Sequence, residues 1–162
     1  IILLPEIPYD IKVVVNAIRK RAEEGKRFTI IAVAEGAISK EDAKLSKKEF
    51  KEKKAKENYP SVAYELAERI QKKMDQEVRI TVPGHTQRGG SPCPYDRVLA
   101  TRLGAAAAER ILEGDYGYMM AIRRGEITKV PLAEVAGKLK TVDPEAGIIK
   151  EARMTGISFG DK

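Results

Sequence analysis

Short apolar runs alternate with amphipathic segments along most of the chain, and this alternation restricts the possible folds more than any other feature of the sequence. The strand-like apolar runs lie at 1–4, 28–34 and 78–82. The segments with apolar residues at helical spacing lie at 11–24, 61–74 and 95–112. Strands that alternate with helices predict an α/β fold with a mainly parallel sheet flanked by helices.

Several elements have recognisable ends. Asp10 can cap the helix that begins at Ile11, and the unbroken apolar run Phe28–Ala34 predicts a strand covered on both faces. After the third long helix, the sequence predicts strands at Tyr118–Ile122 and Ile127–Val130 joined by a tight connection, then a short helix at Pro131–Lys140 and a tail.

The composition indicates one domain with an aliphatic core. The chain has 162 residues with three Phe, six Tyr and no Trp, so Val, Ile, Leu and Ala must fill the interior. It contains no apolar run near 18 residues, which predicts no transmembrane helix, and it has no signal-peptide pattern. Because it opens at Ile1 within a strand-like run, we expect a piece of a longer polypeptide.

Cysteine and histidine are too few for most metal and disulfide chemistry. Cys93 and His85 are the only residues of their kinds, which excludes an internal disulfide and a Cys/His zinc site. Cys93 stands between two prolines, and we interpret it as a turn residue rather than a nucleophile. The low cysteine content is typical of a reducing cytoplasm, where we expect the protein to reside.

Half of the net charge of +6 comes from one stretch. Residues 40–58 hold eight Lys and five Asp or Glu, a surplus of three positive charges. Phe50 is the only aromatic residue in this stretch. The mixed signs favour a solvated helix or loop over a nucleic-acid patch.

The residues most suited to binding lie at the ends of predicted strands, where parallel sheets bind ligands. The segment Gly84–Gly90 combines three glycines with His85 and Arg88. The imidazole of His85 and the fork-shaped guanidinium of Arg88 could together hold an anion. A polar turn without a ligand explains the same pattern. Glu35, after the run 28–34, could accept hydrogen bonds from ligand hydroxyls, or could be a cap or surface residue.

Two charged neighbours have a simpler explanation. Asp96 can cap the helix that follows it, and Arg97 can pair with a nearby carboxylate. We interpret both as structural residues.

Five motifs in order resemble the 6-phosphofructokinase family. The longest is Val82–Pro92 with Tyr95-Asp96-Arg97, which resembles the family's Gly-His-x-Gln-Arg-Gly-Gly-x-Pro…Asp-Arg signature. The shorter matches are Leu4-Pro5-Glu6, Gly25-Lys26, Ala34-Glu35-Gly36 and Arg79. The resemblance implies a partial phosphofructokinase fold and transfer of a phosphoryl group from ATP or pyrophosphate to the 1-hydroxyl of fructose 6-phosphate.

The resemblance also implies roles for single residues. His85 and Arg88 match the residues that bind the 6-phosphate of the sugar, and Glu35 matches the residue that binds the sugar itself. Arg79 matches an arginine that reaches the phosphate from a neighbouring subunit, which implies a homo-oligomer.

The family's catalytic segment Thr-Ile-Asp-Asn-Asp, its Gly-Gly-Asp donor loop and its Met-Gly-Arg segment have no counterpart in this sequence. We therefore expect residues 1–162 to be the C-terminal, fructose 6-phosphate-binding portion of such an enzyme, with no catalytic residue and no metal ligand. Mg²⁺ is expected with the donor, outside this portion. Residues 95–125 are expected to contact the missing donor domain, so their helix should expose apolar surface and promote self-association.

Two other functions are compatible with the residues alone. The glycine-rich loop could belong to a non-catalytic module that binds an anion or a phosphorylated sugar. The Lys-rich stretch 40–58 could bind nucleic acid, although we expect neither a nucleic-acid nor a membrane partner.

Overall fold

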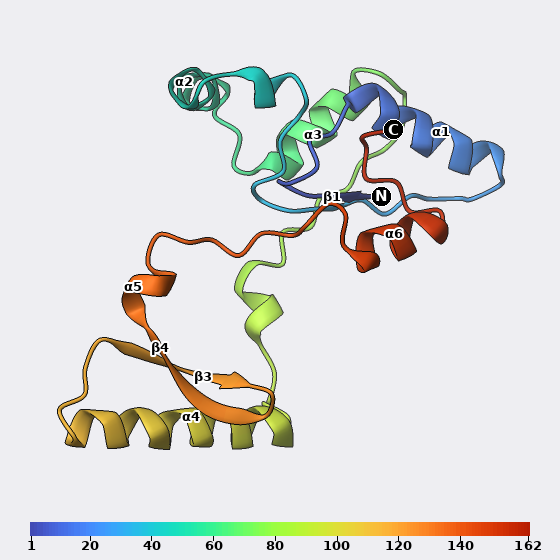
Figure 1. The fold of residues 1–162 in the computed structure, drawn as a ribbon. Coiled ribbons are helices and arrows are strands. Elements are labelled where there is room, and N and C mark those ends of the chain that lie inside the picture. Colours follow the sequence, from blue (N-terminus) through green and yellow to red (C-terminus); the bar gives the residue numbers. More distant parts are fainter. The chain divides into compact units, whose positions relative to one another are not determined.

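The chain divides into two units, and the first is assembled from two separate stretches of sequence. The computed structural model describes residues 1–162 (Figure 1). The first unit comprises Ile1–Val82 and Thr141–Lys162, and the second comprises Pro83–Lys140. The elements of the first unit are β1 (Ile2–Leu3), α1 (Ile11–Glu23), β2 (Ala32–Val33), the 3₁₀ helix η1 (Asp42–Lys44), α2 (Lys47–Glu57), α3 (Val62–Gln71) and α6 (Gly147–Met154).

A parallel pair of strands lies at the centre of the first unit. Ile2 of β1 pairs with Ala32 of β2, and Leu3 pairs with Val33. Because side chains alternate along a strand, Leu3 packs with α1 and α3, while Ile2 packs with the cluster around Ile149 of α6. Helices therefore flank both faces of the pair, which confirms the predicted α/β class, although the sheet is small (Figure 1).

The core is mainly aliphatic, as the composition predicts, with two aromatic exceptions. Tyr9 and Phe159 are the largest fully buried side chains, each about 1% exposed. Burial raises the pKa of Tyr9 to about 12. Backbone hydrogen bonds hold the C-terminal segment to this core, from Ile2 N to Ser158 O (2.9 Å) and from Asp10 N to Gly160 O (2.7 Å).

Gly160 lies where no side chain fits. Its φ of +74° is in the left-handed region, and a Cβ there would lie 2.9 Å from Leu3 Cδ2 and from Tyr9 Cβ. We predict that Gly160→Ala lowers the free energy of unfolding by about 2–4 kcal/mol, the sum of left-handed strain and overpacking. Denaturant unfolding followed by circular dichroism measures the effect.

Gly25→Ala is the matched control for this substitution. Gly25 has a similar φ of +80°, but a Cβ at this position would have no neighbouring atom within 4 Å, so only the backbone cost of about 1 kcal/mol applies. Equal losses in the two variants would contradict the close approach at Gly160.

Two predicted strands are wrong in extent. Phe28–Ala34 forms only the two-residue β2, and Phe28 and Ile30 are exposed, so the run is covered on one face rather than on both. Residues 78–82 form no strand, although Val78 and Ile80 are half-buried and Arg79 and Thr81 are exposed. Half-buried and exposed side chains alternate along this segment as they do in a strand. Its backbone, however, is not paired with any strand of a sheet.

Helix α2 is attached to the first unit by charge rather than by apolar burial. Residues 47–57 include no buried side chain, so the prediction of a solvated stretch holds for the helix itself. The exception nearby is Asp42, which is buried and pairs with Lys53 of α2 and with Arg69 of α3 (3.4 Å). Glu65 of α3 is also buried and pairs with Lys54 of α2.

The pKa of Asp42 makes this attachment dependent on pH. Burial by itself raises the pKa of Asp42, but hydrogen bonds from Lys53 and Ser39 and the charge of Arg69 outweigh burial and lower it below the ordinary value of 3.8. Because the folded state lowers this pKa, the stabilisation is present above pH 3.8 and is lost as the pH falls through the folded value.

We predict that Asp42→Asn lowers the free energy of unfolding at neutral pH by about 1–3 kcal/mol, because Lys53 and Arg69 lose their partner. The same variant should show a smaller loss of stability than the wild type between about pH 5 and pH 2. Denaturant unfolding at a series of pH values measures both. Glu52→Gln is the control, because Glu52 of α2 makes no ion pair, and parallel pH curves for Asp42→Asn and wild type would contradict the assignment.

The second unit consists of a long helix and a hairpin. Its elements are the 3₁₀ helix η2 (Gly84–Arg88), α4 (Pro94–Leu112), β3 (Tyr118–Arg123), β4 (Glu126–Pro131) and α5 (Leu132–Val135). The predicted tight connection is confirmed: Arg124 and Gly125 both have positive φ, as two-residue hairpin turns require. Arg102 Nη2 donates to Gly125 O at 3.1 Å and joins α4 to this turn.

Helix α4 has no buried side chain. Tyr95, Val98, Ile111 and Leu112 are all more than half exposed, as the sequence predicts for this helix. The predicted helix at Pro131–Lys140 is confined to α5, and α6 was not predicted. No helix of the chain combines the length and the apolar content needed to cross a membrane.

Candidate functional site

The glycine-rich loop forms a tight turn that presents an imidazole and a guanidinium. Gly84 (φ +51°) and Gly90 (φ +98°) flank the turn with left-handed backbone that glycine adopts most readily. Within it, Thr86 N donates to Pro83 O (3.0 Å) and Gly89 N donates to Thr86 O (3.1 Å). These bonds are those of a 3₁₀ helix over Gly84–Arg88.

His85 and Arg88 are placed so that they can act together. In a 3₁₀ helix residues three positions apart lie on the same side, and these two residues are separated by that spacing. Both are exposed, and neither side chain makes a hydrogen bond or ion pair within the chain. The turn therefore offers an imidazole and a guanidinium that are both free to bind an anion.

Glu35 lies shortly after β2, in the first unit. It is one of the residues that line a cavity of about 320 Å³. Its carboxylate is exposed and makes no hydrogen bond or ion pair within the chain. The residues that line this cavity are Glu35, Gly36, Ala37, Ile38, Phe50, Lys54, Tyr59, Ser61, Val62 and Glu65. We refer to it below as the Glu35 cavity.

Most polar side chains of the Glu35 cavity are already paired. Lys54 pairs with Glu65, and Tyr59 Oη donates to Glu68 Oε2 at 2.6 Å. Glu65 Oε1 lies 2.7 Å from Arg69 Nη2, a contact whose geometry is that of an ion pair rather than of a hydrogen bond. The charged side chains that α2 and α3 contribute to the cavity, Lys54 and Glu65, are therefore paired with each other.

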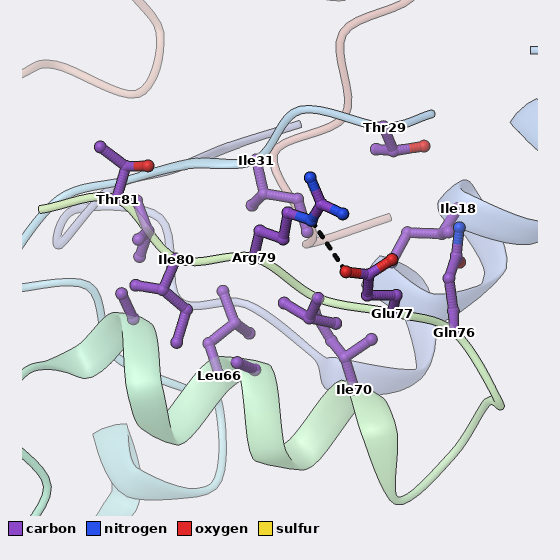
Figure 2. A pocket seen from close by; sticks show the side chains of 14 residues that line it. Ile18, Thr29, Ile31, Leu66, Ile70, Gln76, Glu77, Arg79, Ile80 and Thr81 are labelled. Atoms are coloured by element: carbon purple, nitrogen blue, oxygen red, sulfur yellow. Dashed lines mark hydrogen bonds and ion pairs between the residues drawn. The ribbon is translucent and has the colours of Figure 1, made fainter. Parts of the chain in front are cut away.

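Arg79 lines a different cavity of the first unit. This cavity has a volume of about 180 Å³ and lies between α1, α3 and residues 76–81. Figure 2 shows Leu66 and Ile70 of α3 directed toward the extended segment, and the ion pair from Arg79 Nε to Glu77 Oε1 at 2.8 Å. The Arg79 side chain is 86% exposed, so it remains available to a ligand or to another chain.

The two charged residues in the first turn of α4 have different roles. Asp96 lies within the first turn of α4 rather than before the helix, and its carboxylate accepts a hydrogen bond from N of the N-cap residue Cys93 at 3.3 Å. Arg97 donates from Nε to Pro92 O at 3.2 Å and makes no ion pair, so the predicted carboxylate partner is wrong. The short, proline-rich connection before the helix brings this carbonyl within reach.

Comparison with known proteins identifies the family. The family model for phosphofructokinase matches residues 1–111, which include the glycine-rich loop, Glu35 and Arg79. The chain belongs to the phosphofructokinase family. The similarity extends beyond residue 111, as whole-chain comparisons with phosphofructokinases show.

Three relatives illustrate the similarity. An ATP-dependent 6-phosphofructokinase of Spirochaeta thermophila is 52% identical over 161 residues, 99% of this chain and 44% of that protein. One of Chloroflexus aurantiacus is 41% identical over 162 residues, 100% of this chain and 44% of the relative. ATP-dependent 6-phosphofructokinase 3 of Bacteroides thetaiotaomicron is 40% identical over 160 residues, 99% of this chain and 43% of the relative. The chain spans less than half of the length of these phosphofructokinases.

The four predicted site residues are thus distributed over three places. His85 and Arg88 share one turn of the second unit, whereas Glu35 and Arg79 line separate cavities of the first unit. Sequence reasoning missed Lys54, Tyr59 and Ser61 as neighbours of Glu35 in one cavity. A serine directly before a helix was the one available signal, and it also predicts an ordinary cap.

Proposed function

We propose that this chain is the fructose 6-phosphate-binding, C-terminal portion of an ATP-dependent 6-phosphofructokinase. The observation that carries the proposal is the turn Gly84–Arg88, with His85 and Arg88 free on one side of it. Family membership supports the substrate, since the relatives are named 6-phosphofructokinases. The same names favour ATP over pyrophosphate as the donor.

Each predicted site residue has a role in the proposal. His85 and Arg88 bind the 6-phosphate through charge-assisted hydrogen bonds, which are stronger than neutral ones. Glu35 accepts hydrogen bonds from hydroxyls of the sugar. Arg79 reaches the phosphate bound by a neighbouring subunit of a homo-oligomer, a role to which its high exposure is suited.

The chemical step in the proposal is in-line transfer of the terminal phosphoryl group of ATP to the 1-hydroxyl, giving fructose 1,6-bisphosphate in glycolysis. Positioning supplies much of the acceleration of such a reaction. This portion contributes positioning: it holds the far phosphate and the sugar while a base held elsewhere removes the proton. Residues 95–125 contact the donor-binding part of the same enzyme.

The proposal assigns Mg²⁺ to the donor. In this chain no group of three or more His, Cys, Asp and Glu side chains comes together in a way that could hold a metal ion. We place the ion with ATP, outside residues 1–162, and the enzyme in the cytoplasm.

We predict that Arg88→Ala weakens fructose 6-phosphate binding to the full-length enzyme about 10- to 100-fold, because charge-assisted hydrogen bonds to the phosphate are lost. Glu35→Ala should weaken the same binding about tenfold through lost contacts to the sugar. Calorimetric titration without a donor measures both affinities. Arg123→Ala and Glu52→Gln, which remove equal charges elsewhere, are the controls and should leave the affinity unchanged.

The pattern of losses separates the proposal from its alternatives. A loss with Arg88→Ala but none with Glu35→Ala would indicate a module that binds anions in general, not the sugar phosphate. Binding of nucleic acid that weakens steeply with salt and survives Arg88→Ala would indicate the Lys-rich stretch instead.

The ion pair with Glu77 provides a further prediction for Arg79. Glu77 competes with a phosphate for the guanidinium, and exposed ion pairs of this kind are weak. Glu77→Gln should therefore lower the KM for fructose 6-phosphate by no more than about fivefold, whereas Arg79→Ala should raise it. If Glu77→Gln raised the KM as Arg79→Ala does, the pair would be required for binding rather than competing with it.

A further inference from the structure

Ser61 carries a hydroxyl with no partner in the protein. It lies directly before α3, with extended backbone (φ −159°, ψ 167°), where serine commonly accepts a hydrogen bond from the first turn of a helix. Here only the Ser61 carbonyl does so, accepting from Tyr64 N at 3.1 Å, and the side chain makes no capping bond. Ser61 Oγ is nevertheless buried, and it makes no hydrogen bond within the protein.

Ser61 is one of the residues that line the Glu35 cavity. Lys54, Tyr59 and Glu65 face the same space, but each is already paired with a neighbouring side chain. Glu35 and Ser61 are therefore the polar side chains of the lining that have no partner of their own. At about 320 Å³ the cavity is within the range of small-molecule sites.

The two free groups are chemically complementary. An ionised carboxylate can only accept hydrogen bonds, whereas a serine hydroxyl both donates and accepts. A sugar hydroxyl that donates to Glu35 keeps oxygen lone pairs that need a donor. A sugar hydroxyl that contacts Ser61 can accept a hydrogen bond from the serine hydroxyl or donate one to it.

We propose that Ser61 is a further specificity-determining residue for the sugar, bonding one hydroxyl of the fructose 6-phosphate that Glu35 binds. This inference rests on the proposed function of Glu35. Helix α2 contributes Phe50 and Lys54 to the lining of the cavity, and Lys54 pairs with Glu65 of α3. Because a buried hydroxyl without a partner is unfavourable, a ligand hydroxyl at this position gains more than one at an exposed serine.

The first test is Ser61→Ala in the full-length enzyme. We expect the KM for fructose 6-phosphate and its dissociation constant to rise about 3- to 10-fold, with kcat and the melting temperature unchanged, because no bond within the protein is lost. Ser61→Thr, which retains a hydroxyl, should restore most of the affinity. Ser46→Ala is the matched control: its hydroxyl accepts from Glu49 N at 3.3 Å, so this variant should lose stability and keep its affinity.

The second test identifies the sugar hydroxyl. Analogues of fructose 6-phosphate that each lack one hydroxyl are titrated against wild type and Ser61→Ala. One analogue should bind wild type more weakly by about the factor that Ser61→Ala costs with the full substrate, and should bind the variant with no further loss. If every analogue shows additive losses, Ser61 makes no such bond and the inference fails.

The outcomes distinguish this inference from the function on which it rests. An affinity that falls with Glu35→Ala and is unchanged with Ser61→Ala overturns the role of Ser61 alone. An affinity unchanged in Glu35→Ala and Arg88→Ala overturns the proposed function and the role of Ser61 with it. A lower melting temperature with unchanged KM in Ser61→Ala shows a structural role and also overturns the inference.

Discussion

Two buried carboxylates determine how the charged part of the first unit is built. Asp42 and Glu65 are each about 3% exposed, and a carboxylate in such a position needs cations nearby. Arg69 pairs with both, and Lys53 and Lys54 of α2 pair with one each. Helix α2 has no buried side chain, and Lys53 and Lys54 join it to these two buried carboxylates. Part of the lining of the Glu35 cavity, that contributed by Lys54 and Glu65, is therefore an ion pair.

The second unit differs in that it presents His85 and Arg88 on a short turn with no buried side chain. Its turn uses glycine at Gly84 and Gly90 to reverse the backbone sharply, and the 3₁₀ spacing brings His85 and Arg88 to one side. Neither side chain makes an ion pair with a carboxylate of the chain, so no protein carboxylate competes with a ligand for them. Arg79, in contrast, makes an ion pair with Glu77. Arg79 and Arg88 therefore differ in whether a protein carboxylate is bound to the guanidinium.

Local patterns predicted the long elements well and the short ones poorly. Helices α1, α3 and α4 and the β3–β4 hairpin follow the predicted positions, since their periodicity and turn residues are encoded within each segment. The run Phe28–Ala34 was predicted as a strand with two covered faces, but whether its outer face is covered depends on neighbours that no local pattern specifies. For the site, the loop and Glu35 could be recognised from motifs. Ser61 could not, because its hydroxyl is free only through the way α3 begins in three dimensions.

The connectivity of the first unit has a consequence for the order of folding. Strand β1 obtains one of its backbone partners from Ser158, and Gly160 closes over Leu3 and Tyr9, so the N-terminal segment is completed by residues far along the chain. The second unit, in contrast, is one uninterrupted stretch from Pro83 to Lys140. During synthesis the hairpin and α4 can therefore assemble on the ribosome before the first unit is complete. Until residues 141–162 are translated, part of the apolar interior of the first unit remains uncovered. Chaperone dependence in this chain is expected to fall on the first unit, whose last segment is translated after the whole of the second unit.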